Sequence, residues 1–195
     1  MCGWAGPVAA VVWLLAVFGF GMRLEGYDQL RHPVSLLGAH GVPGGTAFSM
    51  LGFVLPGILA AAAALDLALR MPVTAPRALR VGGQMLLLAA VAFAAMGLLP
   101  LDVEDIENRA SQYHASAWLL WLVGFSAGAL ALRLGSARDA AWRPLANLAV
   151  GCALWSLCSA FLFEIVLPVA MAQRLAFLGW LVWLLGAARL APARG

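Results

Sequence analysis

Six long apolar runs, separated by short polar connections, occupy most of this 195-residue chain. A helix needs about 20 largely apolar residues to cross a bilayer, and a window of about that size finds one candidate span in each run. The predicted spans are residues 7–22, 46–69, 82–99, 115–132, 145–169 and 175–190. They leave no room for a separate soluble domain. We therefore expect residues 1–195 to form a single all-α domain, an integral membrane bundle of six transmembrane helices.

The charged residues are too few for a water-soluble surface. They make up 11% of the chain, whereas soluble domains carry about 25%. The arginines are scattered singly and do not form a basic patch with aromatic residues between them, so nucleic acid is not an expected partner. Membrane lipids are the expected partners.

The arginine distribution predicts the orientation of the bundle. The second and fourth connections and the C-terminal tail carry eight arginines, and the other three connections carry four. The arginine-rich side of a membrane protein normally faces the cytoplasm. Both termini are therefore predicted to be cytoplasmic, and the first, third and fifth connections to face outward.

The first connection, residues 23–45, is unusual among the linkers. It is too polar to cross the membrane, yet it contains enough apolar residues to disfavour full solvation. Backbone that lies at membrane depth without being helical must be shielded by protein. An interfacial or partly re-entrant outer loop is therefore predicted.

Most ionisable residues that could form a site lie on the predicted outer side, where such residues are costly and often functional. Glu164, within the fifth predicted span, either faces an outer pocket or partners Arg174. Asp66 is different, because it precedes Arg70 by four residues and is expected to pair with it on one helix. The outer candidates are His32, Ser35, His40, Asp102, His114 and Arg174.

A shared site for Asp102 and His114 requires a break in the chain between them. Pro100 ends the third span, Asp102 suits a helix cap, and Ser111 is the predicted N-cap of the fourth span. Two residues this far apart on one straight helix would be separated by about 18 Å. They can converge only if the chain turns near residues 108–111.

Three functions remain open from these residues. The first is an outward-facing polar pocket that binds a lipid or another amphiphilic small molecule, in a binding or sensing role, through His32, Arg174 and Glu164. Another is a redox protein, in which paired histidines hold a haem or a quinone lies against the tryptophans.

The remaining function is that of a membrane-embedded hydrolase or transferase acting on a lipid. Asp102, His114 and Ser35 would be its catalytic residues. His32, His40 and His114 could bind a zinc-like ion through imidazole nitrogens and leave one position open for water. The chain lacks both the His-Glu-x-x-His and the Cys-x-x-Cys pattern, so spacing alone does not favour the metal.

The order of several short motifs resembles the bacterial membrane family catalogued as domain of unknown function 998. The resemblance covers nearly the whole chain and implies six helices in the bacterial cytoplasmic (inner) membrane. Ser35, Asp102, His114 and Arg174 hold positions of the family pattern, whereas His40 lies outside it. Leu99 stands where the family commonly has an aromatic residue, and the resemblance implies no activity. The motifs are residues 32–39, 52–57 and 99–102, His114, and Gln173-Arg174.

Overall fold

The computed structural model describes residues 3–103, 105, 107–137 and 139–193, and every regular element in that part of the chain is helical. Six helical segments among these residues are long and apolar enough to cross a membrane, as predicted. They are α1 (Ala5–Arg23), the continuous series α2 (Gly45–Phe48), η2 (Ser49–Val54) and α3 (Leu55–Leu69), then α4 (Arg77–Leu98), α5 (Arg109–Gly135), α6 (Arg143–Phe161) with η3 (Phe163–Ile165), and α7 (Val169–Leu190).

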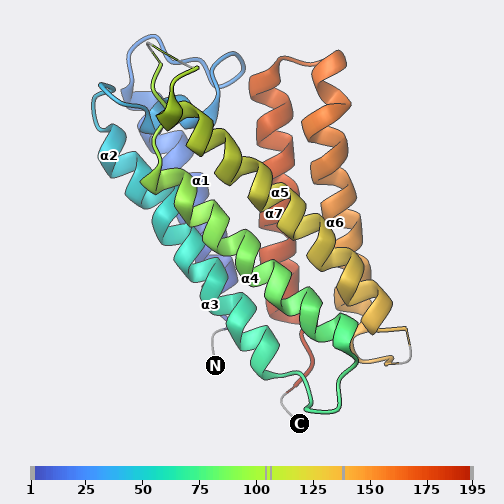
Figure 1. The fold of residues 1–195 in the computed structure, drawn as a ribbon. Coiled ribbons are helices and arrows are strands. Elements are labelled where there is room, and N and C mark those ends of the chain that lie inside the picture. The colour runs from blue at the N-terminus through green and yellow to red at the C-terminus, as the bar shows by residue number, and fades with distance from the viewer. Residues whose placement is uncertain (1–2, 104, 106, 138, 194–195) are drawn as a thin grey trace.

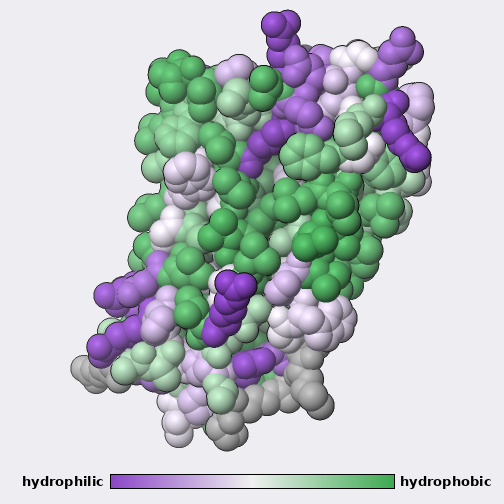
Figure 2. All heavy atoms as spheres, turned by 180° about the vertical axis from the view of Figure 1, so that it is seen from behind, coloured by the Kyte–Doolittle hydropathy of each residue, from purple (hydrophilic) through white to green (hydrophobic). Residues whose placement is uncertain are grey.

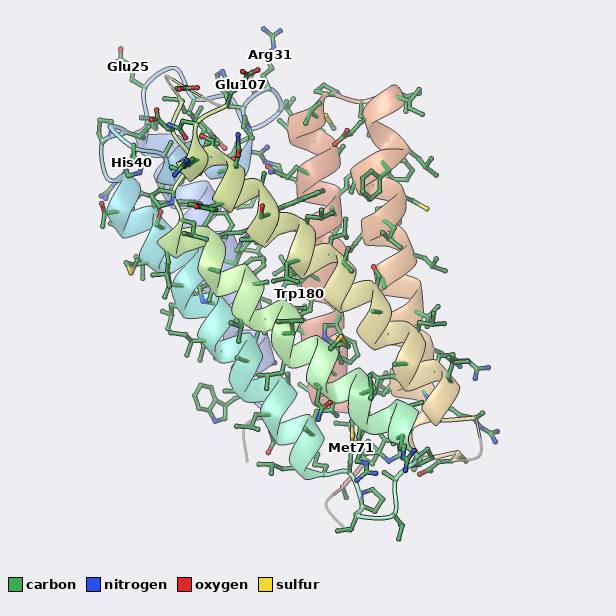
Figure 3. The ribbon with its side chains drawn as sticks, viewed as in Figure 1. Glu25, Arg31, His40, Met71, Glu107 and Trp180 are labelled. Carbon is green, nitrogen blue, oxygen red and sulfur yellow. The ribbon has the colours of Figure 1, made fainter. Side chains whose placement is uncertain are left out.

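The helices run up and down, so alternate connections gather at opposite ends of the bundle (Figure 1). We call the end formed by residues 24–44, 99–108 and 162–168 the loop end. The opposite end holds both termini and is called the termini end. On the face shown in Figure 2, apolar side chains cover the middle of the bundle and hydrophilic side chains gather toward its two ends. Of the residues labelled in Figure 3, Glu25, Arg31, His40 and Glu107 lie at the loop end and Met71 lies at the termini end.

Three helices begin five or more residues before the spans predicted from hydropathy. Helix α4 begins at Arg77 directly after Pro76, α5 begins at Arg109, and α7 begins at Val169 directly after Pro168. Proline is pre-set for the start of a helix and cannot continue a preceding one. The fifth span therefore ends before residue 169. Each added segment contains at least one arginine, which lowers its mean hydropathy and explains why a hydropathy window omits it.

The second span is not a uniform α-helix. Residues Ser49–Val54 wind as a π-helix immediately before Pro56. Pro56 has no N–H to give to the carbonyl four residues earlier, and a π segment is one way in which a helix accommodates such an interruption. The Ser49 hydroxyl donates to the carbonyl of Gly38 at 3.2 Å, which ties this segment to the first connection.

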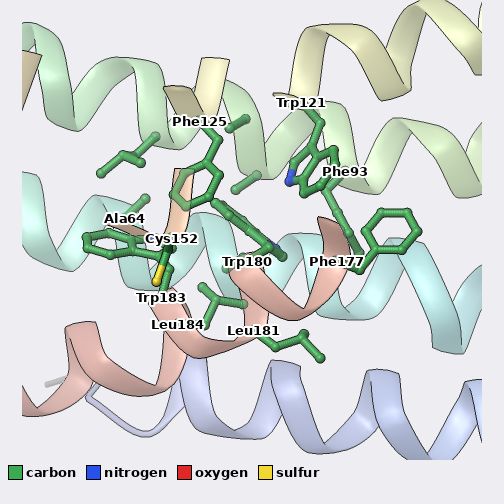
Figure 4. Packing of buried hydrophobic residues seen from close by; sticks show 14 of the residues in the cluster. Ala64, Phe93, Trp121, Phe125, Cys152, Phe177, Trp180, Leu181, Trp183 and Leu184 are labelled. Atoms are coloured by element: carbon green, nitrogen blue, oxygen red, sulfur yellow. The ribbon is translucent and has the colours of Figure 1, made fainter. Parts of the chain in front are cut away.

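Aromatic side chains fill the centre of the bundle (Figure 4). The ring centroids of Trp121 and Phe177 are 5.1 Å apart, and those of Phe125 and Trp180 are 5.0 Å apart at a nearly perpendicular angle. The second pair meets edge to face, an arrangement that stabilises a core beyond the area that it buries. The packed centre leaves polar groups to gather toward the two ends of the bundle.

The predicted pair of Asp66 and Arg70 forms at the termini end. Nε and Nη2 of Arg70 donate to one carboxylate oxygen of Asp66 at 2.9 and 2.6 Å, and Nη1 donates to the carbonyl of Pro192 at 3.0 Å. The two residues lie one helical turn apart, as expected for residues at this spacing. Because Arg70 also bonds to Pro192, the pair has a structural role: it holds the C-terminal segment.

Candidate functional site

A cavity of about 230 Å³ lies at the loop end, between the start of α5 on one side and η3 with the start of α7 on the other. We call it the loop-end cavity. It brings together three of the residues predicted for a site, Ser35, His114 and Glu164, from three separate parts of the chain. The lining residues are Ser35, His114, Ala115, Trp118, Glu164, Val169 and Gln173.

His114 is held in this cavity by the end of α4. Its Nδ1 lies 2.9 Å from the carbonyl oxygen of Leu99 and 3.1 Å from that of Met96. The last carbonyls of a helix lack partners within the helix, and the N–H that the Met96 carbonyl would otherwise accept belongs to position 100, which is proline. The imidazole therefore satisfies carbonyls that Pro100 leaves unpaired.

These two contacts assign the tautomer of His114. Carbonyl oxygens only accept hydrogen bonds, so Nδ1 carries the proton and donates. In the neutral ring the lone pair then lies on Nε2. No described residue is hydrogen-bonded to Nε2, although the side chain is only 7% exposed. A buried imidazole with one nitrogen held and the other available can accept a hydrogen bond or a proton.

Ser35 lies on the other wall of the cavity, in the short helical turn η1 (Val34–Gly38). It is 7% exposed, and its hydroxyl has no hydrogen-bond partner in the described part of the chain. The backbone N–H of the preceding residue, Val34, donates to Oε1 of Gln173 at 2.9 Å. Gln173 thus fixes the segment that carries Ser35 against α7.

Two further polar groups complete the cavity lining. The indole Nε1 of Trp118 is buried without a partner, and buried polar groups in proteins are rarely left unsatisfied. The carboxylate of Glu164 is exposed and belongs to η3, at the end of its span. Glu164 does not pair with Arg174 in the structure. It lines the loop-end cavity.

Arg174 holds the first connection and does not line the cavity. Its Nη2 donates to the Tyr27 hydroxyl at 2.6 Å and to Oε1 of Gln29 at 2.9 Å, and its Nη1 donates to the His32 carbonyl at 2.9 Å. Its Nε is buried without a partner. These contacts make Arg174 a clamp between α7 and the segment that leads to Ser35.

Tyr27 is the residue at the centre of this clamp. Burial raises the pKa of its hydroxyl above the ordinary value of 10.0, and the neighbouring Arg174 guanidinium acts in the opposite direction. The phenol therefore keeps its proton at neutral pH. It donates that proton to the Pro33 carbonyl at 3.2 Å while it accepts from Arg174.

Asp102 supports the start of α5 and is not among the cavity-lining residues. Its carboxylate accepts a hydrogen bond from the Asn108 amide at 2.7 Å, and its N–H donates to the Ser111 hydroxyl at 3.2 Å. Asn108, not Ser111, is the N-cap of α5, since its side chain accepts from the Ser111 N–H. The predicted turn near residues 108–111 is present, but it brings Leu99 rather than the Asp102 side chain into contact with His114.

The three histidines occupy three different places. Nδ1 of His32 accepts from the Asp28 N–H at 2.9 Å, and the exposed His40 lines a separate cavity of about 260 Å³ beside Gly41, Thr46 and other residues. Among the described residues, no group of three or more His, Cys, Asp or Glu side chains is placed to hold a metal ion. The three histidines of the predicted zinc-like centre therefore do not converge on one place among the described residues.

Comparison with known families gives one finding. A family profile described as "Protein of unknown function (DUF998)" matches residues 8–190. The chain belongs to this family. The DUF998 match covers nearly the whole chain and agrees with the six-helix bundle, and it assigns no activity. No curated protein matches the DUF998 chain, and no solved structure matches it.

Four residues that line the loop-end cavity were not among those predicted for a site: Ala115, Trp118, Val169 and Gln173. The available signal was Pro168, which marks the start of α7 and places Gln173 inside the helix, opposite the first connection. Ala115 and Trp118 carry no signal of their own, because a small residue and a tryptophan are ordinary in a transmembrane helix.

Proposed function

We propose that this DUF998 chain is a bacterial inner-membrane protein whose termini are cytoplasmic and whose loop end faces outward. The charges of the two ends support this orientation. The predicted cytoplasmic connections, the C-terminal tail and the helix ends beside them carry eight arginines and two acidic residues, whereas the loop end and the helix ends beside it carry four arginines and seven acidic residues. Positive residues in short loops favour the cytoplasmic side, and the apolar middle of the face shown in Figure 2 matches the hydrocarbon layer.

The first connection fits an interfacial position in this orientation. Val34 and Leu37 are buried against the helices, while Arg31 at the tip of the connection is exposed. Gln173 and Arg174 satisfy backbone groups on both sides of Pro33. Backbone near membrane depth must be satisfied in this way, so we place the connection in the headgroup layer as a cover of the bundle.

The loop-end cavity binds the polar head group of a lipid or another amphiphile. The observation that carries this proposal is the unpaired Nε2 of His114 in a cavity that also contains the unpaired hydroxyl of Ser35. Exposed apolar side chains near the cavity suit an apolar tail, because Ile165 and Val166 directly follow the lining residue Glu164 in the chain and are both 78% exposed. A few convergent polar groups in a partly apolar concavity are typical of a ligand site.

A single substitution tests this function. Ala115→Phe places a ring in the loop-end cavity, and we expect the fraction of purified protein that retains bound lipid, measured by native mass spectrometry, to fall about tenfold, which is about 1.4 kcal/mol of binding free energy. Ser116→Phe is the matched control, since Ser116 is the next residue of α5, is exposed and does not line the cavity. Equal retention by the two variants would contradict a ligand in this cavity.

A second candidate function is acyl transfer, favoured by the same two groups. Ser35 Oγ would attack the carbonyl carbon of a lipid ester while its proton passes to His114 Nε2. The ester C–O bond then breaks and the alcohol leaves with that proton. Water, deprotonated by His114, next hydrolyses the acyl-serine and releases the fatty acid. Leu99 and Met96 hold the ring as the orienting partner of a serine–histidine pair does.

This second function predicts covalent labelling of Ser35 by a fluorophosphonate probe. Ser35→Ala should abolish the labelled peptide, and His114→Gln should slow labelling by about 10²-fold or more, because a general base contributes 10²–10⁴. Ser116→Ala should label like the wild-type protein. A wild-type protein that retains lipid but is never labelled would reject the enzyme and leave the binding function.

A further inference from the structure

The loop-end cavity offers hydrogen-bond acceptors and has no basic side chain. The Glu164 carboxylate is the charged group of the lining, and none of the seven lining residues is an arginine; the chain has no lysine. Nε2 of His114 is an acceptor in the tautomer that Leu99 and Met96 impose, and the Ser35 hydroxyl can accept as well as donate. The donors of the lining, such as the Trp118 indole, are neutral. A phosphate inside the cavity would lack the basic donors that it needs, so the phosphate of a bound lipid would lie outside the lining.

We propose that the loop-end cavity is specific for a primary ammonium group, and that the physiological ligand is a phospholipid with an amine-bearing head group. The proposal rests on the proposed lipid-binding function and adds the class of ligand. A primary ammonium has three N–H donors, and the cavity offers three acceptor groups without protein partners on Glu164, His114 and Ser35. Two of these residues, His114 and Ser35, are more than nine-tenths buried.

Trp118 adds a second recognition element for a cation. Its ring lines the same cavity, and an aromatic face within about 6 Å of an ammonium attracts it through the quadrupole of the ring. Carboxylate and aromatic groups together favour a cationic ligand. A neutral hydroxyl head group would use the acceptors but would gain nothing from the charge of Glu164.

The charge around the cavity supports the same sign of ligand. Seven of the nine acidic residues of the chain belong to the loop-end segments, whereas these segments and the helix ends beside them carry four of its twelve arginines. The guanidinium of Arg174 is directed to Tyr27, Gln29 and the His32 carbonyl and is not part of the lining. The field at this end therefore concentrates cations near the opening.

The test compares lipids that differ only in the head group. Purified wild-type protein in nanodiscs is titrated with phosphatidylethanolamine and phosphatidylcholine of identical acyl chains, and bound lipid is counted by native mass spectrometry. The choline nitrogen has a charge but no N–H. We expect at least about tenfold preference for phosphatidylethanolamine in the wild-type protein, and we expect that preference to fall to about twofold or less in Glu164→Gln.

Glu25→Gln is the matched control. Glu25 is another acidic residue at the loop end (Figure 3) and does not line the cavity, so its replacement should keep the full preference. Soluble phosphoethanolamine forms a separate arm. If it displaces the lipid at equal concentration, the ammonium site stands and the ligand source is a soluble amine; if it fails to compete, the lipid is the ligand.

These results distinguish specificity for an ammonium group from lipid binding itself. Equal binding of the two lipids, or an unchanged preference in Glu164→Gln, overturns ammonium specificity; if Ala115→Phe still blocks lipid retention, the binding function survives. Lipid retention that is insensitive to Ala115→Phe removes the binding function itself.

Discussion

Gly57→Ala is expected to destabilise the bundle by about 2–3 kcal/mol, because α3 and α4 approach each other too closely at this point to admit a Cβ atom. A Cβ on residue 57 would lie 2.5 Å from the backbone nitrogen of Ala94 and 2.7 Å from its Cα. Neither atom can move without shifting α4, and overpacking of a close-packed core costs about 1–3 kcal/mol, occasionally more. The thermal midpoint in detergent should fall by roughly 4–12 °C.

The control for this prediction is the same substitution at Gly151 in α6. A Cβ at Gly151 meets nothing within 4 Å, and alanine is favoured over glycine within a helix by about 1 kcal/mol. Gly151→Ala should therefore leave the midpoint unchanged or raise it. A similar midpoint for the two variants would show that the backbones of α3 and α4 do not come this close.

Arg174→Met is expected to release the first connection from α7 and to cost about 3 kcal/mol of stability. The substitution removes every hydrogen bond by which the guanidinium holds Tyr27, Gln29 and the His32 carbonyl. Hydrogen bonds to charged groups contribute about 1.5–3 kcal/mol each, and part-buried partners left unpaired add their own cost. Trypsin applied from the outer side should cleave after the exposed Arg31 at least about tenfold faster than in the wild-type protein.

Arg109→Met controls for the loss of a cation at the same end of the bundle. Arg109 is exposed at the start of α5, so its replacement should leave cleavage after Arg31 unchanged. Arg174→Lys should behave like Arg174→Met, because an ammonium cannot reproduce the planar fork of donors. Protection of Arg31 in Arg174→Met would mean that other contacts hold the connection. Because Val34 and Ser35 follow the clamped segment, Arg174→Met should also lower lipid retention.

The bundle was predictable because span length and hydropathy report directly on bilayer thickness. The same signal misplaced the starts of α5 and α7, since the beginnings of these helices carry polar residues such as Gln112 and Gln173. Pro76 and Pro168 were better markers of helix starts than hydropathy was. A proline limits a helix through its own backbone, so this effect can be predicted from the sequence alone.

The site was predictable only in part, because convergence of distant segments depends on tertiary packing. Ser35, His114 and Glu164 meet in one cavity, as the outward placement of polar residues suggested. Asp102 and Arg174 lie at the same end but have their contacts elsewhere, with Asn108 and with Tyr27. The sequence shows which side chains can form hydrogen bonds, but it does not show which neighbour each of them bonds to in the folded chain. The cost of leaving the Met96 carbonyl unpaired explains why the His114 ring is held against the end of α4.

Ligand binding in the loop-end cavity depends on the tautomer of His114, and nitrogen NMR of the histidine rings measures it directly. With only three histidines in the chain, selective ¹⁵N labelling and the variants His32→Gln and His40→Gln assign every signal. We expect His114 to carry its proton on Nδ1, and phosphatidylethanolamine to shift the Nε2 signal while it leaves Nδ1 protonated. A proton on Nε2 of the neutral ring, or an Nε2 signal indifferent to every lipid tested, would contradict the proposed binding.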